Sequence, residues 1–99
     1  MPSVLVVDDE PAVRESLRML LKQECDVETA ESVDTALEQV RKSIPDLVLL
    51  DVVMPGRNGL ELIPELRTSG IECPVIVLTA TNTVSVAVEA MKLGAADFV

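Results

Sequence analysis

Three carboxylates of this 99-residue chain stand directly beside apolar runs of the sequence. Asp8 and Asp9 follow SVLVV, and Asp51 follows LVLL. The chain contains no histidine, tryptophan or tyrosine. The absence of histidine excludes Ser-His-Asp, Cys-His and histidine-rich zinc sites. Any chemistry must therefore depend on carboxylates, hydroxyls, lysine, backbone amides and a hard metal ion.

Asp51 is the residue that most needs an explanation. A carboxylate that borders a buried strand is costly unless another group compensates its charge. Helix capping does not supply that group, because the next predicted helix begins several residues later, at Asn58. For Asp8 and Asp9 capping remains an alternative, since acids before a helix N-terminus accept its free amides and contribute about 1 kcal/mol.

A magnesium ion would resolve the charge conflict among these acids. Clustered carboxylates disfavour one another's ionisation, and a divalent cation with oxygen ligands removes that conflict. A carboxylate beside Mg²⁺ can also accept a phosphoryl group, because the metal neutralises the phosphoryl oxygens during in-line attack. Thr79 could then contact the phosphoryl group, with Ala80 leaving room for it to enter. The alternative for Thr79 is a strand-end hydroxyl that completes a turn.

The elements that must position these residues alternate along the chain. Apolar runs of strand length are separated by segments of helical period, without a linker, repeat or low-complexity tract. The predicted strands are Ser3–Val7, Asp26–Ala30, Leu47–Leu50 and residues 74–78 and 95–99. The predicted helices begin at Pro11, after the N-cap Ser32, at Asn58 and Gly59, and after the N-cap Thr83; the last two end at Gly70 and Gly94.

Apolar stripes on the first three helices indicate which faces are buried. The residues are Val13, Leu17, Leu20 and Leu21 in the first helix, Val33, Ala36, Leu37 and Val40 in the second, and Leu60, Ile63 and Leu66 in the third. Pro64 lies within the third helix, where it removes one backbone donor and should bend the helix.

Strict alternation of five strands and four helices predicts an α/β fold with a doubly wound parallel sheet. Ligands of such sheets bind beyond the carboxyl ends of the strands, where the acids are expected to meet. The sequence ends in DFV without a helix that would complete the alternation. We therefore expect residues 1–99 to be one domain, truncated at the fifth strand, with aliphatic sheet surface exposed.

Charge and cysteine content limit the partners and the compartment. Eight Lys and Arg against seventeen Asp and Glu give a net charge of -9, which disfavours direct contact with nucleic acid or anionic membranes. Cys25 and Cys73 are far apart in sequence, and the N-terminus lacks a basic n-region and a long apolar stretch. These features predict a cytoplasmic protein whose cysteines pack without pairing.

Four motifs, in this order and spacing, resemble the response regulator receiver domain of bacterial two-component signalling. They are VLVVDDEP, LVLLDVVMPGRNGLEL, VIVLTA and LGAADFV, and together they cover essentially the whole chain. The resemblance implies a flavodoxin-like fold with strand order 2-1-3-4-5 and a phosphoacceptor switch rather than an enzyme. The family's lysine and fifth helix follow the DFV-like stretch and are not in this sequence.

The resemblance also implies roles for the acidic residues. Asp51 would be the phosphorylation site, and Asp8 and Asp9 would form the acidic pocket. Mg²⁺ would be held by Asp9, Asp51 and the backbone carbonyl of Val53, with Asp8 acting through water. The donor would be a sensor histidine kinase or a phosphotransfer protein.

Output would pass through the helix over residues 83–93. By resemblance, Thr79 follows the phosphoryl group and Phe98 is the switch aromatic; both would shift this helix. We hypothesise that its stripe of Val86, Ala90 and Leu93 docks a second protomer or an effector domain, although such small residues could simply tolerate exposure. The final 21 residues look more like receivers of sigma-54-type activators than like receivers of winged-helix regulators. The parent would then carry an ATPase and a DNA-binding effector domain.

Three rival functions are weaker. A phosphohydrolase of the haloacid dehalogenase type needs a second carboxylate two residues after its nucleophile, where this chain has Val53. A receiver-like binding module that is never phosphorylated predicts a degraded pocket, whereas Asp8, Asp9, Asp51 and Thr79 are all present. A flavodoxin-like cofactor binder would need aromatic or glycine-rich loops, and four glycines with one phenylalanine offer neither.

Overall fold

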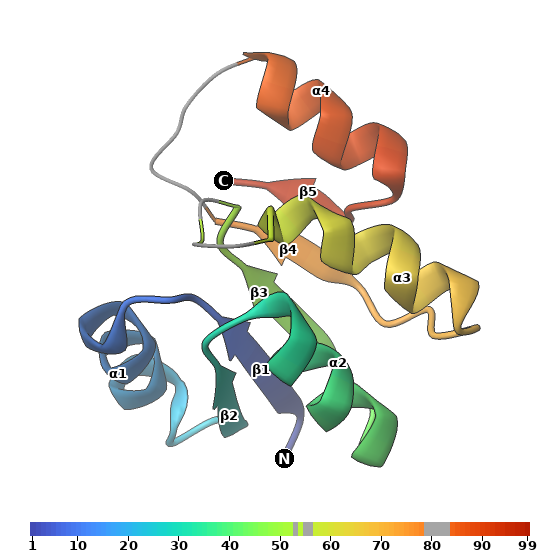
Figure 1. Cartoon of the computed structure of the whole chain (residues 1–99). Helices are drawn as coiled ribbons and strands as arrows, with labels where there is room; N and C mark the ends of the chain where they lie inside the picture. The colour runs from blue at the N-terminus through green and yellow to red at the C-terminus, as the bar shows by residue number, and fades with distance from the viewer. Residues whose placement is uncertain (53, 55–56, 79–83) are drawn as a thin grey trace.

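Five parallel strands form one sheet in the computed structural model of the chain (Figure 1). The structure describes residues 1–52, 54, 57–78 and 84–99, without the side chains of residues 84, 85 and 98. The strands are β1 (Ser3–Val7), β2 (Asp26–Ala30), β3 (Leu47–Leu50), β4 (Val75–Val77) and β5 (Asp97–Phe98). Their order, β2-β1-β3-β4-β5, confirms the predicted topology.

The last two strands are shorter than the predicted ranges 74–78 and 95–99. Hydrogen bonds to their neighbours nevertheless extend past both ends of β4. The Val48 amide donates to the Pro74 carbonyl at 3.0 Å, and the Leu78 amide donates to the Leu50 carbonyl at 2.8 Å. Leu78 therefore continues the line of β4 toward the carboxyl edge of the sheet.

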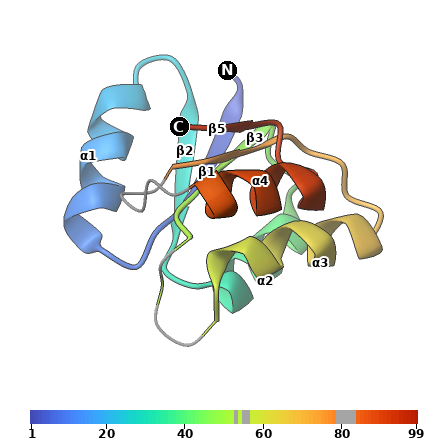
Figure 2. The same ribbon diagram turned by 90° about the horizontal axis from the view of Figure 1, so that it is seen from above.

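Helices cover both faces of the sheet, as predicted. They are α1 (Pro11–Leu21), α2 (Val33–Lys42), the short 3-10 helix η1 (Gly59–Glu61), α3 (Leu62–Thr68) and α4 (Val84–Leu93). One face is covered by α1 and the other by α2, α3 and α4 (Figure 2). In the described part of the chain, no helix is both long enough and apolar enough to cross a bilayer.

The helix ends follow the predicted signals. The Thr35 amide donates to the Ser32 hydroxyl at 3.1 Å, and Gly70 and Gly94 take the positive φ angles of 80° and 107° that suit glycine after a helix. Thr83 lies outside the described residues. Pro64 falls in the first turn of α3, a position where a missing backbone donor is tolerated.

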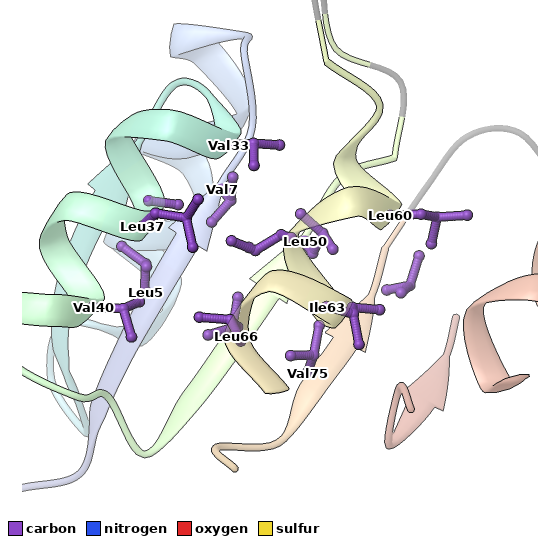
Figure 3. Packing of buried hydrophobic residues seen from close by; sticks show 14 of the residues in the cluster. Leu5, Val7, Val33, Leu37, Val40, Leu50, Leu60, Ile63, Leu66 and Val75 are labelled. Carbon is purple, nitrogen blue, oxygen red and sulfur yellow. The ribbon is translucent and has the colours of Figure 1, made fainter. Parts of the chain in front are cut away.

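The main core lies between the sheet and the helices α2 and α3 (Figure 3). Alternate strand residues point toward this face, and the predicted stripes of both helices meet them. The labelled members are Leu5, Val7, Leu50 and Val75 from the strands, Val33, Leu37 and Val40 from α2, and Leu60, Ile63 and Leu66 from η1 and α3. This face of the sheet therefore carries most of the apolar burial.

The opposite face is less covered, in agreement with the exposed aliphatic surface that the sequence predicts. Helix α1 has no fully buried residue, and a groove of about 480 Å³ lies between it and the sheet. Val13 and Leu17 of α1 line this groove together with Leu49 and Leu78, which are only half-buried. The prediction that Leu20 packs inward is wrong, because 77% of it is exposed.

Helix α4 corrects the hypothesis about the output surface. Ala90 is fully buried, and Val86 and Leu93 pack partly buried against the core. The stripe that we expected to dock a partner is therefore the inward face of the helix. The outward face carries Val88 and Met91, which are 45% and 51% exposed.

Both cysteines are free, as predicted. Cys25 is partly exposed, whereas Cys73 is buried and belongs to the core. Burial raises the pKa of the Cys73 thiol, although the nearby Arg67 opposes this effect. Cys73 therefore behaves as an apolar packing residue with an unreactive thiol.

Truncation of a side chain in the core should lower stability much more than truncation of an exposed side chain on α1. Leu66→Ala removes a fully buried side chain and should lower the free energy of unfolding by about 2–5 kcal/mol. Leu20→Ala, at an exposed position, should change it by no more than about 0.5 kcal/mol. Urea denaturation followed by circular dichroism measures both. Equal losses in the two variants would contradict this description of the core.

Candidate functional site

Two neighbouring strands bring the acidic residues to one edge of the sheet. In the register of β1 and β3, Val7 lies beside Leu50, so Asp8 and Asp51 both follow directly at the carboxyl edge. The Asp8 amide donates to the Ala30 carbonyl at 3.0 Å, and the Asp51 amide donates to the Val7 carbonyl at 2.9 Å. The backbone of both aspartates is therefore fixed by the sheet.

The side chains of Asp8, Asp9 and Asp51 converge. Each offers one carboxylate oxygen, and these oxygens all lie within 4.8 Å of one another. Asp8 is buried, with 7% of it exposed, and Asp9 and Asp51 are half-buried. A half-buried set of three oxygen donors fits a hard divalent cation such as Mg²⁺. The sequence predicted this meeting of Asp8, Asp9 and Asp51, and the structure brings them together.

The turn after β1 is held by both the side chain and the backbone of Asp8. Its Oδ1 accepts a hydrogen bond from the Glu10 amide at 2.9 Å, and its carbonyl accepts one from Arg14 Nη1 at 2.7 Å. The N-cap residue of α1 is Glu10, whose side chain makes no capping bond. Asp8 therefore stabilises the turn before α1 rather than capping its first turn, and Arg14 is a supporting residue that the sequence did not reveal.

Gly59 sets the backbone on the other side of Asp51. Its amide donates to the Val52 carbonyl at 2.9 Å. A Cβ added at Gly59 would lie 2.1 Å from the Asp51 carbonyl oxygen and 3.0 Å from the Val52 Cα. Only glycine allows the chain to pass this close to Asp51. Spacing along the sequence could not show this contact, because it joins residues on two sides of a turn.

A reciprocal cap at Asn58 fixes the point where the chain leaves this turn. The Leu60 amide donates to Asn58 Oδ1 at 2.9 Å, and the Asn58 amide donates to Glu61 Oε2 at 3.0 Å. An Asn followed three residues later by Glu is a known start signal for helices, so the sequence did contain this information.

Several predicted site residues lie outside the described part of the structure. These are Val53, Thr79 and Ala80, together with the side chain of Phe98. The backbone of Phe98 belongs to β5 and lies beside Val77 in the parallel register. The roles predicted for Thr79, Phe98 and the Val53 carbonyl therefore stay predictions.

Comparison with protein families identifies the class. A family profile for the response regulator receiver domain matches residues 4–99. The chain is 45% identical over 96 residues to the response regulators MprA of Mycobacterium sp. (strain KMS) and Mycobacterium leprae (strain TN). The match covers 96% of this chain and 42% of each relative, so the chain spans less than half the length of these regulators.

Solved structures give the same result. The receiver domain of the Francisella response regulator 1452 superposes with a TM-score of 0.92 at 28% identity, covering 100% of this chain and 83% of that chain. The BeF3-activated receiver domain of Klebsiella pneumoniae RstA superposes with a TM-score of 0.89 at 31% identity, covering 98% of this chain and 83% of that one.

The fold and the acidic edge thus define a phosphoacceptor switch of two-component signalling. The chain belongs to the response regulator receiver domain family. Receiver domains bind Mg²⁺ at their acidic pocket, and this chain has the corresponding cluster of aspartates. The narrower resemblance to sigma-54-type activators stays a prediction.

A methyl group at Gly59 should disturb the site through the backbone of Asp51. Gly59→Ala should cost about 1–3 kcal/mol of stability through overpacking. It should also weaken Mg²⁺ binding, measured by titration calorimetry, by about tenfold or more, because it displaces Asp51.

Gly70→Ala is the matched control for this variant. Its φ of 80° makes alanine strained by about 1–2 kcal/mol, but no atom of the described residues other than Gly70 and its chain neighbours lies within 4 Å of the added Cβ. It should therefore lower stability and leave Mg²⁺ affinity unchanged. A similar loss of Mg²⁺ affinity in both variants would show that general destabilisation, rather than the contact with Asp51, weakens the site.

Proposed function

We propose that Asp51 is the residue of this receiver domain that accepts the phosphoryl group. The observation that supports this assignment most directly is the convergence of the carboxylates of Asp8, Asp9 and Asp51 within 4.8 Å at the carboxyl edge of the sheet. Asp51 directly follows the central strand β3, whereas Asp8 and Asp9 come from the turn after β1. One carboxylate is thus flanked by two others that can hold a metal.

In the proposed reaction, a carboxylate oxygen of Asp51 attacks the phosphorus of the donor in line. A phosphorus–oxygen bond to Asp51 forms, the bond from phosphorus to the donor breaks, and the donor leaves with that electron pair. Asp9, Asp51 and the Val53 carbonyl would hold Mg²⁺, with Asp8 acting through water. Bound there, Mg²⁺ supplies charge neutralisation at the phosphoryl oxygens.

The described residues contribute position rather than acid–base chemistry. Hydrogen bonds at the amides of Asp8 and Asp51 hold both backbones to the sheet, and Gly59 supports the peptide that follows Asp51. Attack by a carboxylate needs no proton removed from the nucleophile, so a site of aspartates is sufficient. With Val53 in place of a second carboxylate, we propose a regulatory domain that is not a phosphohydrolase.

The donor and the output belong to the proposed function as well. The chain has no histidine, so a histidine phosphodonor must lie in another protein or another domain, and we propose a sensor kinase or a phosphotransfer protein. Thr79 and Phe98 would respond to the new charge on Asp51 and shift α4. A downstream effector domain, which we propose to be DNA-binding, would respond to that shift. The two free cysteines support a reducing, cytoplasmic setting.

The acceptor can be tested with a small phosphodonor. With Mg²⁺ and acetyl phosphate, the chain should gain the mass of one phosphoryl group, and Asp51→Asn should gain none. Asp26→Asn removes an exposed carboxylate at the start of β2 and should behave like the wild type. Mass spectrometry of the intact protein measures all three. Phosphorylation of Asp51→Asn, or none in the wild type, would refute the assignment.

We propose the outward face of α4 as the output surface, in place of the buried stripe. Ala87, Val88, Met91 and Lys92 line a shallow hollow on this face. A second copy of the chain is the proposed occupant, because Lys92 and the exposed Glu89 on the same helix have opposite charges and could pair across a two-fold contact.

Charges on the outward face should prevent this assembly. The double variant Val88→Glu and Met91→Glu should lower the dimer fraction that appears with Mg²⁺ and beryllofluoride in sedimentation velocity. Leu20→Glu, at an apolar and more exposed position on α1, should leave that fraction unchanged. A dimer fraction that persists in the α4 variant, or falls only in the α1 variant, would place the contact elsewhere.

A further inference from the structure

In the part of the chain that follows Asp51, one guanidinium joins three elements. Arg57 lies in the turn between Asp51 and α3, and its side chain is one-third exposed. Its Nη1 donates to Asp34 Oδ1, in the first turn of α2, at 2.7 Å. Its Nη2 donates to Glu65 of α3 and lies 3.6 Å from Glu61 Oε1 of η1. Arg57 is therefore bound from two sides, by helices that are separate in the sequence.

The same turn is fixed at its two ends by the backbone. It begins where the Asp51 amide is bound to the Val7 carbonyl, and it closes where the Gly59 amide donates to the Val52 carbonyl. Arg57 lies two residues before this closure. Its bond to Asp34 connects the far side of the turn to α2, which is anchored in the core by four buried residues.

The arrangement suits arginine rather than lysine. A guanidinium presents several donors in a rigid plane and can bind two carboxylates in different directions, whereas an ammonium is a point charge. Hydrogen bonds to Asp34 and then Glu65 raise the pKa of Arg57 further, so the group stays charged. A single exposed ion pair contributes little, but this network ties a turn to two helices.

We propose that Arg57 is a positioning residue that holds the turn after Asp51 in the geometry the acidic site needs to bind Mg²⁺. This inference rests on the proposed function of that site. Arg57 lies two residues before Gly59, whose amide is bound to the Val52 carbonyl and which leaves no room for a Cβ beside the Asp51 carbonyl. Movement at Arg57 therefore reaches the backbone of Asp51 through Gly59.

Simple electrostatics predicts the opposite effect, which makes the inference testable. Removal of Arg57 changes the net charge of the chain from -9 to -10, and a more negative protein attracts Mg²⁺ more strongly. Loss of positioning weakens Mg²⁺ binding instead. The sign of the change therefore distinguishes positioning from charge.

Titration calorimetry with MgCl₂ at fixed ionic strength provides the first measurement. Arg57→Ala should raise the dissociation constant for Mg²⁺ by about 3- to 10-fold. This increase is smaller than the one expected when a residue that hydrogen-bonds directly to a metal ligand is removed, because Arg57 acts through the backbone. Arg18→Ala is the matched control, since it removes one positive charge and one Arg–Glu pair on α1. It should leave affinity equal or slightly higher. Equal or tighter binding in Arg57→Ala would overturn the inference.

Amide exchange in the metal-free protein provides a second, independent measurement. The Gly59 amide, which closes the turn, should exchange faster in Arg57→Ala than in the wild type, while the Thr35 amide at the Ser32 cap should not change. Unchanged exchange at Gly59 would also overturn the inference. If Arg57→Ala fails to fold, Arg57→Lys decides: it should weaken Mg²⁺ binding because lysine cannot span both carboxylates, and wild-type affinity would refute the proposal.

The wild-type protein separates this inference from the proposed function. If the wild type binds no Mg²⁺ and takes no phosphoryl group, the proposed function fails before Arg57 is considered. If the wild type binds Mg²⁺ and Arg57→Ala binds it equally well, only the role of Arg57 fails.

Discussion

Three carboxylates held within 4.8 Å of one another repel, and the rest of the structure must overcome that repulsion. Backbone hydrogen bonds of the aspartates themselves oppose this repulsion. Asp8 and Asp51 each directly follow a strand, and each donates its backbone amide to a neighbouring strand. Because β1 and β3 are adjacent and parallel, any unfolding that separates the acids must first break the centre of the sheet. The site is therefore as stable as the central strand pair.

The two faces of the sheet contribute unequally to that stability. The face covered by α2, α3 and α4 contains the contiguous core, whereas the α1 face leaves Leu49 and Leu78 half-buried beside a groove. Asp8 and Asp51 also line this groove. The acids thus sit at the border between the well-packed and the poorly packed side. Their backbones are held by hydrogen bonds within the sheet, while the side of the groove is the one from which an ion could approach them.

Local sequence signals were sufficient for the presence of the five strands, for the Ser32 cap, for the glycines after α3 and α4, and for the meeting of the acids. Strand ends in a parallel sheet share one edge, so the positions of Asp8, Asp9 and Asp51 followed from the apolar runs before them. The degree to which each helix residue is buried could not be predicted from these signals. The stripes of α1 and α4 were visible, but Leu20 is exposed and Ala90 is buried, because burial depends on what lies opposite each helix. The Arg57 network and the approach of Gly59 to Asp51 join distant residues, which no spacing reveals.

A switch of this kind needs one part that stays still and another that moves at low cost. The amide of Asp51, the proposed acceptor, is bound to the Val7 carbonyl, and the carbonyl of the next residue, Val52, is bound to the Gly59 amide. These bonds oppose a shift of the Asp51 backbone when a phosphoryl group is added. Among the described side chains, α2 has four buried residues and α3 has three, whereas α4 has only Ala90 buried, with Val86 and Leu93 partly buried against the core. Because the free energy lost when a helix shifts grows with the apolar surface it must uncover, α4 can shift at a lower cost than α2 or α3.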